Sequence, residues 1–107
     1  MKRGRRRRGR QGRMPTPVII DHTSTITSFQ PLPKEYGEPI QIELAELEVL
    51  RLIDLEDLSQ EEAGDKMGIS RGTIWRLQKR ARTKVTGALI EGRRLIISDH
   101  DQVNGQN

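Results

Sequence analysis

Apolar residues first recur with helical spacing between residues 44 and 58. They step by three along one line and are flanked by further apolar positions, which predicts a helix over Leu44–Leu58. So broad an apolar surface suits a helix packed under two neighbours, or one that also makes a dimer contact. The carboxylates of this helix are expected to form a solvated face turned away from phosphates. The apolar stripe consists of Leu44, Leu47, Val49, Leu50, Leu52, Ile53 and Leu55.

Two further helical segments follow, joined by a tight turn. Ser59 and Glu62 have the spacing of a capping box, which begins a helix at Gln60. Gly68 ends this helix, because glycine adopts the left-handed cap conformation at little cost. Ser70 then caps the next helix. The two helices and the turn between them are therefore predicted to form a helix-turn-helix.

Two glycines in this unit have different expected roles. Gly64 is expected where the two helices come closest, which would explain a residue about 0.8–1 kcal/mol less favourable than alanine in a helix. Gly72 has no such packing reason: either it lets the backbone approach a phosphate or base, or it has no function. The apolar contacts of the unit are expected to be Ala63, Met67, Ile69, Ile74 and Leu77.

The last pattern predicts a long helix over Ser70–Glu91. Its apolar positions follow 3-4-4-3 spacing and so share one face. At about 100° per residue, polar, basic and small residues gather on the opposite side. A recognition helix reaches base edges with its N-terminal residues and the DNA backbone with later ones. The apolar face is Ile74, Leu77, Ala81, Val85 and Ala88, and the opposite face is Gly72, Arg76, Lys79, Arg80 and Thr83.

Individual roles in DNA binding follow from residue type and position. Arg71 and Arg76 are the candidates for bidentate contact with guanine. Trp75 either contacts a thymine methyl or sugar, or is a partly exposed packing residue. Phosphate contacts, which position the protein without specifying sequence, fit the remaining polar residues. They are Thr73, Lys79, Arg80 and Arg82, with Ser70 and Gly72 beside them at the helix start.

These stretches resemble a known family. Residues 46–63 and 67–77, with Ala81-Arg82, Lys84-Val85, Ala88-Leu89 and Glu91-Gly92, are similar to the domain-of-unknown-function family one hundred and thirty-four. The resemblance covers roughly residues 29–97. It implies a helix-turn-helix similar to region four of sigma factors, within the winged-helix-like superfamily, and hence DNA binding and gene regulation. The chain departs from the family pattern at Gly72, at Trp75 and at Glu43, where a capping threonine is usual.

Composition and charge agree with a small nucleic-acid-binding domain. The 107 residues are 33% apolar with one Phe, one Tyr and one Trp, which allows one small aliphatic core and tails. The absence of cysteine excludes disulfides and thiolate metal sites. No apolar run is long enough to span a membrane, so we expect a cytoplasmic, nucleoid-associated protein.

Residues 1–13 carry eight Lys or Arg and no acid, and residues 71–94 carry eight basic residues against Glu91 alone. Such sorting is expected where an element faces a polyanion.

The chain divides into four expected segments. Residues 1–13 are a disordered basic tail, either a phosphate-binding arm containing Arg5, Arg6, Arg7 and Arg8, a solubilising tail, or untranslated sequence if synthesis begins at Met14. Residues 14–38 form an extended, proline-containing segment. Residues 39–98 form the helix-turn-helix domain. Residues 99–107 are a disordered polar tail, in which Asp99, His100 and Asp101 are a weak metal-binding alternative.

Short strands are expected outside the helices. In the extended segment, Val18–Ile20 and Thr25–Thr27 could form strands, with Phe29 and Tyr36 anchoring the segment on the helical body. Residues 39–43 and 94–98 are expected to pair as a two-stranded β ribbon within the domain, or to pair between subunits.

The predicted fold is therefore mainly α, a three-helix helix-turn-helix domain with a small two-stranded β ribbon and a disordered basic N-terminal tail. The expected partner is double-stranded DNA, bound by a homodimer that acts as a transcriptional regulator. The alternatives are an RNA- or ribosome-associated basic protein, and a sigma-like module that docks on the transcription machinery. No cofactor, metal or small-molecule substrate is expected. An enzyme is the weakest hypothesis, since no plausible cluster of catalytic residues and no phosphate-binding glycine loop are present.

Overall fold

The structure is a computed structural model that describes residues 18–21 and 25–98. The predicted arm with Arg5–Arg8, the tail at 99–107 and its candidate metal ligands lie outside these residues. The described chain is mainly helical with three α-helices, as predicted for the fold class, and it has a small three-stranded sheet. The elements are β1 (Ser28–Phe29), β2 (Ile40–Glu43), α1 (Leu44–Leu50) with a π-helical turn η1 (Arg51–Leu55), α2 (Gln60–Met67), α3 (Arg71–Glu91) and β3 (Leu95–Ser98).

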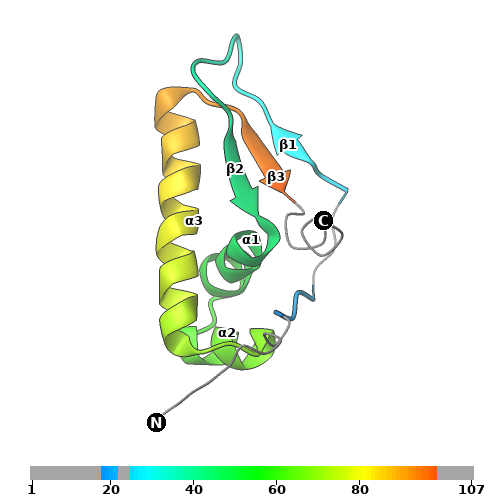
Figure 1. The fold of residues 1–107 in the computed structure, drawn as a ribbon, viewed down its shortest axis with the longest axis vertical. Helices are drawn as coiled ribbons and strands as arrows, with labels where there is room; N and C mark the ends of the chain where they lie inside the picture. The colour runs from blue at the N-terminus through cyan, green and yellow to red at the C-terminus, as the bar shows by residue number, and fades with distance from the viewer. Residues whose placement is uncertain (1–17, 22–24, 99–107) are drawn as a thin grey trace, which may run out of the picture.

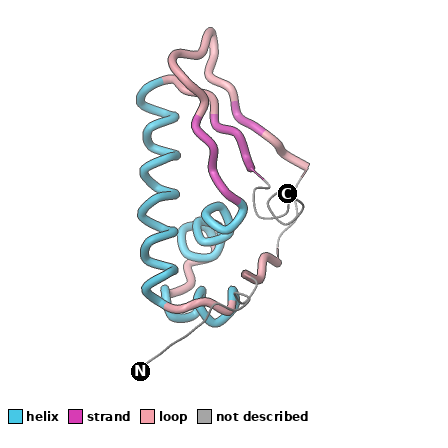
Figure 2. The backbone as a smooth tube through the Cα atoms, in the orientation of Figure 1, coloured by secondary structure: helices cyan, strands magenta, loops and turns pink. Residues whose placement is uncertain are grey.

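The long helix α3 forms one side of the molecule (Figure 1). Helix α2 crosses beside the N-terminal end of α3, whereas the sheet lies beside its C-terminal half. Helix α1 packs against α3 between these two parts, as the tube drawing also shows (Figure 2). The two ends of α3 are therefore surrounded by different structures.

The sheet corrects the expected two-stranded ribbon. Strands β2 and β3 pair as predicted, with Ile40 opposite Leu95, and they run parallel, which the helical crossover between them permits. A third strand, β1, pairs antiparallel with β3, so that the order is β1-β3-β2. The expected strand at 25–27 is displaced: Thr27 accepts a backbone hydrogen bond from Ile97 at 2.9 Å, but the strand begins at Ser28.

The other expected strand, Val18–Ile20, does not form. Instead, the Ile19 backbone N–H donates to the Met67 carbonyl oxygen at 3.0 Å. Val18 packs against the helical core. This part of the chain is therefore held at the end of α2 and not in the sheet.

The main core lies where α1, α2 and α3 meet. The five expected apolar contacts between α2, the turn after it and α3 are confirmed: Ala63, Met67 and Ile74 are fully buried, Leu77 is buried, and Ile69 packs partly buried against them. Helix α1 contributes Ala45, Val49 and Leu52 to the same cluster.

The first helix is shorter than predicted. Regular α-helix ends at Leu50, and a π-turn follows in which the Glu56 N–H donates to the Arg51 carbonyl oxygen at 2.9 Å. Asp57 then takes a positive φ of 66°, which cannot continue a helix. The π-turn is wider than a turn of α-helix, so the apolar side chains in it point in other directions than an α-helix would give them. As a result, Leu55 is 79% exposed.

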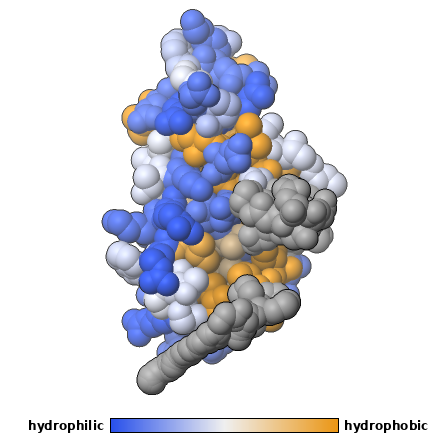
Figure 3. Space-filling model, in the orientation of Figure 1, coloured by the Kyte–Doolittle hydropathy of each residue, from blue (hydrophilic) through white to orange (hydrophobic). Residues whose placement is uncertain are grey.

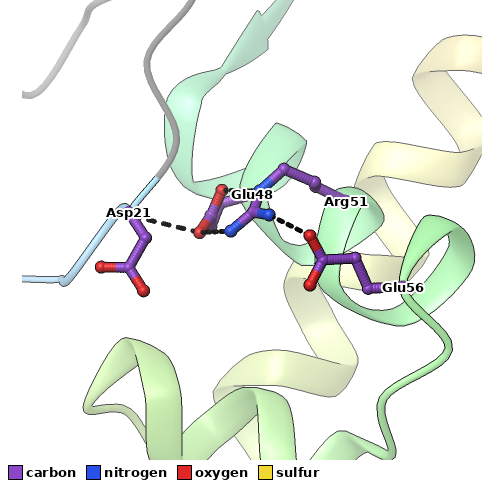
Figure 4. Close-up of polar contacts among 4 residues, drawn as sticks. All are labelled: Asp21, Glu48, Arg51 and Glu56. Atoms are coloured by element: carbon purple, nitrogen blue, oxygen red, sulfur yellow. Dashed lines mark hydrogen bonds and ion pairs between the residues drawn. The ribbon is translucent and has the colours of Figure 1, made fainter.

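The expected solvated acidic face of helix one is wrong for two of its carboxylates. Glu46 and Glu48 are 1% and 3% exposed. Glu48 accepts from Arg51 Nη2 at 2.8 Å and from the backbone N–H of Asp21 at 3.2 Å, and Arg51 also pairs with Glu56 (Figure 4). The hydrogen bond to Glu48 raises the pKa of Arg51 above its usual value. These buried acids hold parts of the fold together.

The expected anchors of the extended segment are also corrected. Phe29 is 61% exposed, so it does not fix the segment in the core. Tyr36 is 57% exposed, yet its ring lies over Gly92, where an added Cβ would come within 3.0 Å. The Tyr36 backbone N–H also donates to the Gly92 carbonyl oxygen at 2.7 Å. Backbone pairing therefore does much of the anchoring that the aromatic rings were expected to do.

Candidate nucleic-acid interface

The start of α2 has the predicted capping box. The Glu62 N–H donates to Ser59 Oγ at 3.0 Å, and Glu62 Oε1 accepts from the Ser59 N–H at 2.8 Å. At the other end, Gly68 takes a left-handed φ of 70° and donates its N–H to the Gly64 carbonyl oxygen. These local bonds fix both ends of the helix that precedes the turn.

The turn and the two helices pack as closely as the sequence predicts. A Cβ on Gly64 would lie 2.8 Å from the carbonyl oxygen of Ile69, so only glycine permits this approach. The Gln60 side-chain amide donates to Gln78 Oε1 at 2.9 Å, and Gln78 is 7% exposed. A partly buried amide pair thus links the beginning of α2 to the middle of α3.

The N-terminus of α3 is capped as predicted. Ser70 Oγ accepts from the Thr73 N–H at 3.1 Å and lies 2.9 Å from Thr73 Oγ1. Arg76 Nη2 donates to Thr73 Oγ1 at 3.3 Å. This chain of contacts runs along the exposed side of the first two turns and orients the Arg76 guanidinium there.

The other predicted residues of these turns also face solvent. Arg71 and Gly72 are exposed, and a Cβ on Gly72 would meet nothing closer than Arg76 Nη1 at 3.9 Å. No packing role for Gly72 is therefore visible. Trp75 is 52% exposed, and Lys79 Nζ lies 5.7 Å from its ring centroid. The outer side of α3 is mostly hydrophilic in the space-filling view (Figure 3).

Two predicted phosphate contacts are engaged within the protein. Arg80 Nε donates to Glu46 Oε2 at 3.2 Å, and Lys84 Nζ donates to Glu46 Oε1 at 2.8 Å. Arg82 forms a bidentate ion pair with Asp54, with Nε 3.1 Å from Oδ2 and Nη2 2.5 Å from Oδ1. This hydrogen bonding raises the pKa of Arg82 above its usual value.

The basic residues of α3 therefore fall into two groups. Within residues 18–21 and 25–98, no carboxylate forms an ion pair with Arg71, Arg76 or Lys79, whereas Arg80 and Arg82 are paired with the first helical segment. We call the exposed side of the first turns, formed by Ser70, Arg71, Gly72, Thr73, Trp75, Arg76 and Lys79, the outer face of α3. Sequence reasoning missed Glu46 and Asp54, whose only signal was their acidity opposite a basic helix.

The outer face of α3 can offer cations, hydroxyls and an aromatic ring to a flat or grooved polyanion. Across the described ranges, no group of three or more His, Asp or Glu side chains is arranged to hold a metal ion. Among those same residues, no helix has both the length and the apolar character that crossing a membrane requires.

The sequence of the chain is similar to those of several known proteins. The family model described as protein of unknown function DUF134 matches residues 1–104. A UPF0251 protein of Pyrococcus furiosus is 46% identical over 98 residues, which cover 89% of this chain and 83% of that protein. One of Archaeoglobus fulgidus is 39% identical, covering 82% and 84%. One of Thermococcus kodakarensis is 55% identical over 69 residues, covering 64% of this chain and 57% of the relative. No solved structure matches the chain significantly.

Proposed function

Because the chain belongs to the DUF134 family of proteins of unknown function, we propose its function from the geometry of α2 and α3: sequence-specific binding of duplex DNA, for transcriptional regulation. In this proposal α2 and the turn present α3 to the major groove. The groove is about 12 Å wide and accepts one helix. Helix α3 would enter with its first two turns, where side chains reach base edges.

One observation carries the proposal: the outer face of α3 is exposed and cationic, while the opposite face of the same turns is buried. Arg71, Arg76 and Lys79 are exposed, whereas Ile74 is fully buried and Leu77 is 6% exposed. Thr73 orients Arg76 by the 3.3 Å contact between Oγ1 and Nη2. An oriented guanidinium has the fork geometry that guanine O6 and N7 require.

Within this proposal the three exposed cations have different tasks. Arg76 and Arg71 would read bases, because they lie at the first two turns. Lys79 lies one turn later and would contact phosphate, as a point charge suits a contact that positions without specifying. Trp75 would contact a thymine methyl or a sugar beside it. Arg80 and Arg82 would contribute to phosphate binding only by exchanging the carboxylates of Glu46 and Asp54 for a phosphate.

A homodimer is part of the proposal. One helix of this kind contacts only a few base pairs, so two copies related by a twofold axis would recognise an inverted repeat. The cellular location proposed with it is the nucleoid. The basic residues 1–13 would add affinity without sequence preference.

The proposal is tested by competition between nucleic acids. Fluorescence anisotropy would follow binding of the full chain to a labelled duplex, with unlabelled duplex DNA and a structured RNA of equal phosphate content as competitors. Stronger competition by duplex DNA is expected, and Arg76→Ala should narrow the difference between cognate and random duplexes. Stronger competition by RNA, unchanged by Arg76→Ala, would instead favour an RNA-associated protein.

A further inference from the structure

An apolar groove runs across the side of the molecule formed by β1, α1 and the C-terminal half of α3. It consists of two adjoining hollows. The first has a volume of about 470 Å³ and is lined by Ile26, Leu50, Leu55 and Ile97, and the second, of about 690 Å³, includes Leu32, Val85 and Leu89. Phe29 and Leu47 line both hollows, so the two are parts of one continuous surface.

The groove has protruding apolar side chains beside its hollows. Leu32, Leu55 and Leu89 are 86%, 79% and 77% exposed, and the central Phe29 is 61% exposed. Exposed apolar side chains gathered on one surface often form an interaction site. A small ligand would bury the hollows and leave these protruding side chains in water. The groove therefore requires a partner with a surface of its own.

The remaining residues of this chain cannot supply that surface. Residues 1–17, 22–24 and 99–107 contain just three large aliphatic side chains, those of Met1, Met14 and Val103. Eight of the first thirteen residues are Lys or Arg, and the last nine residues are otherwise polar, charged or glycine. Burying such segments in an apolar groove would desolvate charges without compensation.

A second copy of the chain fits the groove for two reasons. First, the same patch has both protruding side chains and hollows on either side of its centre, as a self-complementary surface across a twofold axis requires. Second, the groove lies at a suitable distance from the outer face of α3. Arg76 and Leu89 are 13 positions apart in α3, which is about 20 Å at 1.5 Å per residue. A twofold axis close to Leu89, at the rim of the groove, would separate the two copies of Arg76 by up to about 40 Å, a range that includes the 34–36 Å between successive half-sites on DNA.

The segment next to the groove is held rigidly. Arg51 and Asp54 line the first hollow and lie in the π-turn. Arg51 is fixed by Glu48 and Glu56, and Asp54 is fixed by Arg82 (Figure 4 shows the Arg51 contacts). π-turns often occur at functional sites, and this one displays Leu55 at the rim of the groove. A fixed rim lowers the conformational entropy cost of association.

We propose that this groove, centred on Phe29 and Leu47, is the interface through which two copies of the chain form a twofold dimer. The inference rests on the proposed function only for the spacing of the two outer faces. The surface itself follows from exposure and shape.

The test measures mass in solution without DNA. Sedimentation velocity of the full chain is expected to give twice the chain mass of 12.2 kDa at micromolar concentration. Phe29→Glu combined with Leu55→Glu should give a monomer with an unchanged circular dichroism spectrum, because both side chains are exposed. Ile90→Glu is the matched control, since Ile90 is also 79% exposed but does not line the groove, and it should remain dimeric. A monomeric wild-type chain, or a double variant that stays dimeric, would overturn the proposal.

A second measurement remains decisive if the double variant fails to fold. The chain has no cysteine, so Phe29→Cys introduces a single thiol at the centre of the groove. A short bismaleimide should cross-link Phe29→Cys into dimers and leave Ile90→Cys monomeric on a denaturing gel. Equal cross-linking of the two variants, or none, would overturn the proposal. Neither experiment contains DNA, so a result that overturns the dimer interface would leave the proposed DNA binding untouched. A chain that dimerises through the groove but binds no duplex would contradict only the proposed function.

Discussion

Glu46 and Lys84 are 38 positions apart, yet Lys84 Nζ lies 2.8 Å from Glu46 Oε1 inside the domain. The same carboxyl group accepts from Arg80 at 3.2 Å and from the Glu43 N–H at 3.0 Å. It therefore joins the start of α1 to the middle of α3. The contact helps to hold α3 against α1, since these two helices pack together.

Glu46→Gln should destabilise the domain, since it removes the charge that Arg80 and Lys84 share. Breaking a buried pair costs about 3–5 kcal/mol, and a destabilisation of about 2–3 kcal/mol is expected here because both cations can still reach water. Asp54→Asn is the control: its pair with Arg82 is exposed and should cost less than about 1 kcal/mol. Urea unfolding measures the free energy of unfolding of both variants. An equal loss in the two would show that the Glu46 carboxylate is no more important for stability than an exposed ion pair.

Asp54→Asn should also change DNA binding, because it frees Arg82 from its carboxylate partner. One more phosphate contact would steepen the log–log salt dependence of the association constant by about 0.9. Glu38→Gln removes the same charge from an exposed side chain that forms no ion pair within the described ranges, and it should leave the slope unchanged. Titrations at several salt concentrations measure the slopes. The same slope for both variants would mean that Arg82 never reaches a phosphate.

Two glycines, one in α2 and one in α3, should respond oppositely to substitution by alanine. Gly64→Ala places a Cβ 2.8 Å from the Ile69 carbonyl oxygen, so the melting temperature should fall. Gly72→Ala places a Cβ no closer than 3.9 Å to a neighbouring side chain, which is an ordinary contact, and should stabilise α3 by up to about 0.8–1 kcal/mol from helix propensity. If Gly72 allows a close approach to DNA, the stabilised variant should nevertheless bind duplex more weakly. A stabilising Gly64→Ala would contradict the packing that we describe.

Deleting residues 1–13 should weaken binding to all duplexes by a similar factor, because the phosphate contacts expected of their eight Lys and Arg residues do not specify sequence. The salt dependence should become flatter by about 0.9 for each phosphate that the tail no longer neutralises. Both effects are measured by titrating the full chain and the deletion variant with cognate and random duplexes at several salt concentrations. A deletion that abolishes discrimination between sites would assign sequence recognition to the tail.

The parts of the fold that local rules govern could be predicted from the sequence. The caps at Ser59 and Ser70 and the stop at Gly68 depend on residues three or four positions apart, and the structure confirms all three. The close approach at Gly64 followed from the cost of glycine within a helix. The exposure of Arg76 and Lys79 followed from helical periodicity.

The parts that depend on distant residues could not be predicted. The burial of Glu46 needs Arg80 and Lys84 from another helix, and nothing near it in the sequence indicates them. Strand β1 has two exposed residues and no alternating pattern, so only its partner β3 reveals it. The early end of α1 depends on a π-turn, which has no hydrophobic period of its own. For this reason, only the structure could show which basic residues of α3 form ion pairs with carboxylates and which do not.

We propose that the outer face of α3 reads DNA sequence through Arg76. Selection of bound duplexes from a random pool, with the full chain and Arg76→Ala in parallel at near-physiological salt, tests this proposal. We expect an enriched inverted repeat for the full chain, and relaxed preference at one position of each half-site for the variant, worth about 1–3 kcal/mol. No enriched motif, or the same motif with both proteins, would contradict it.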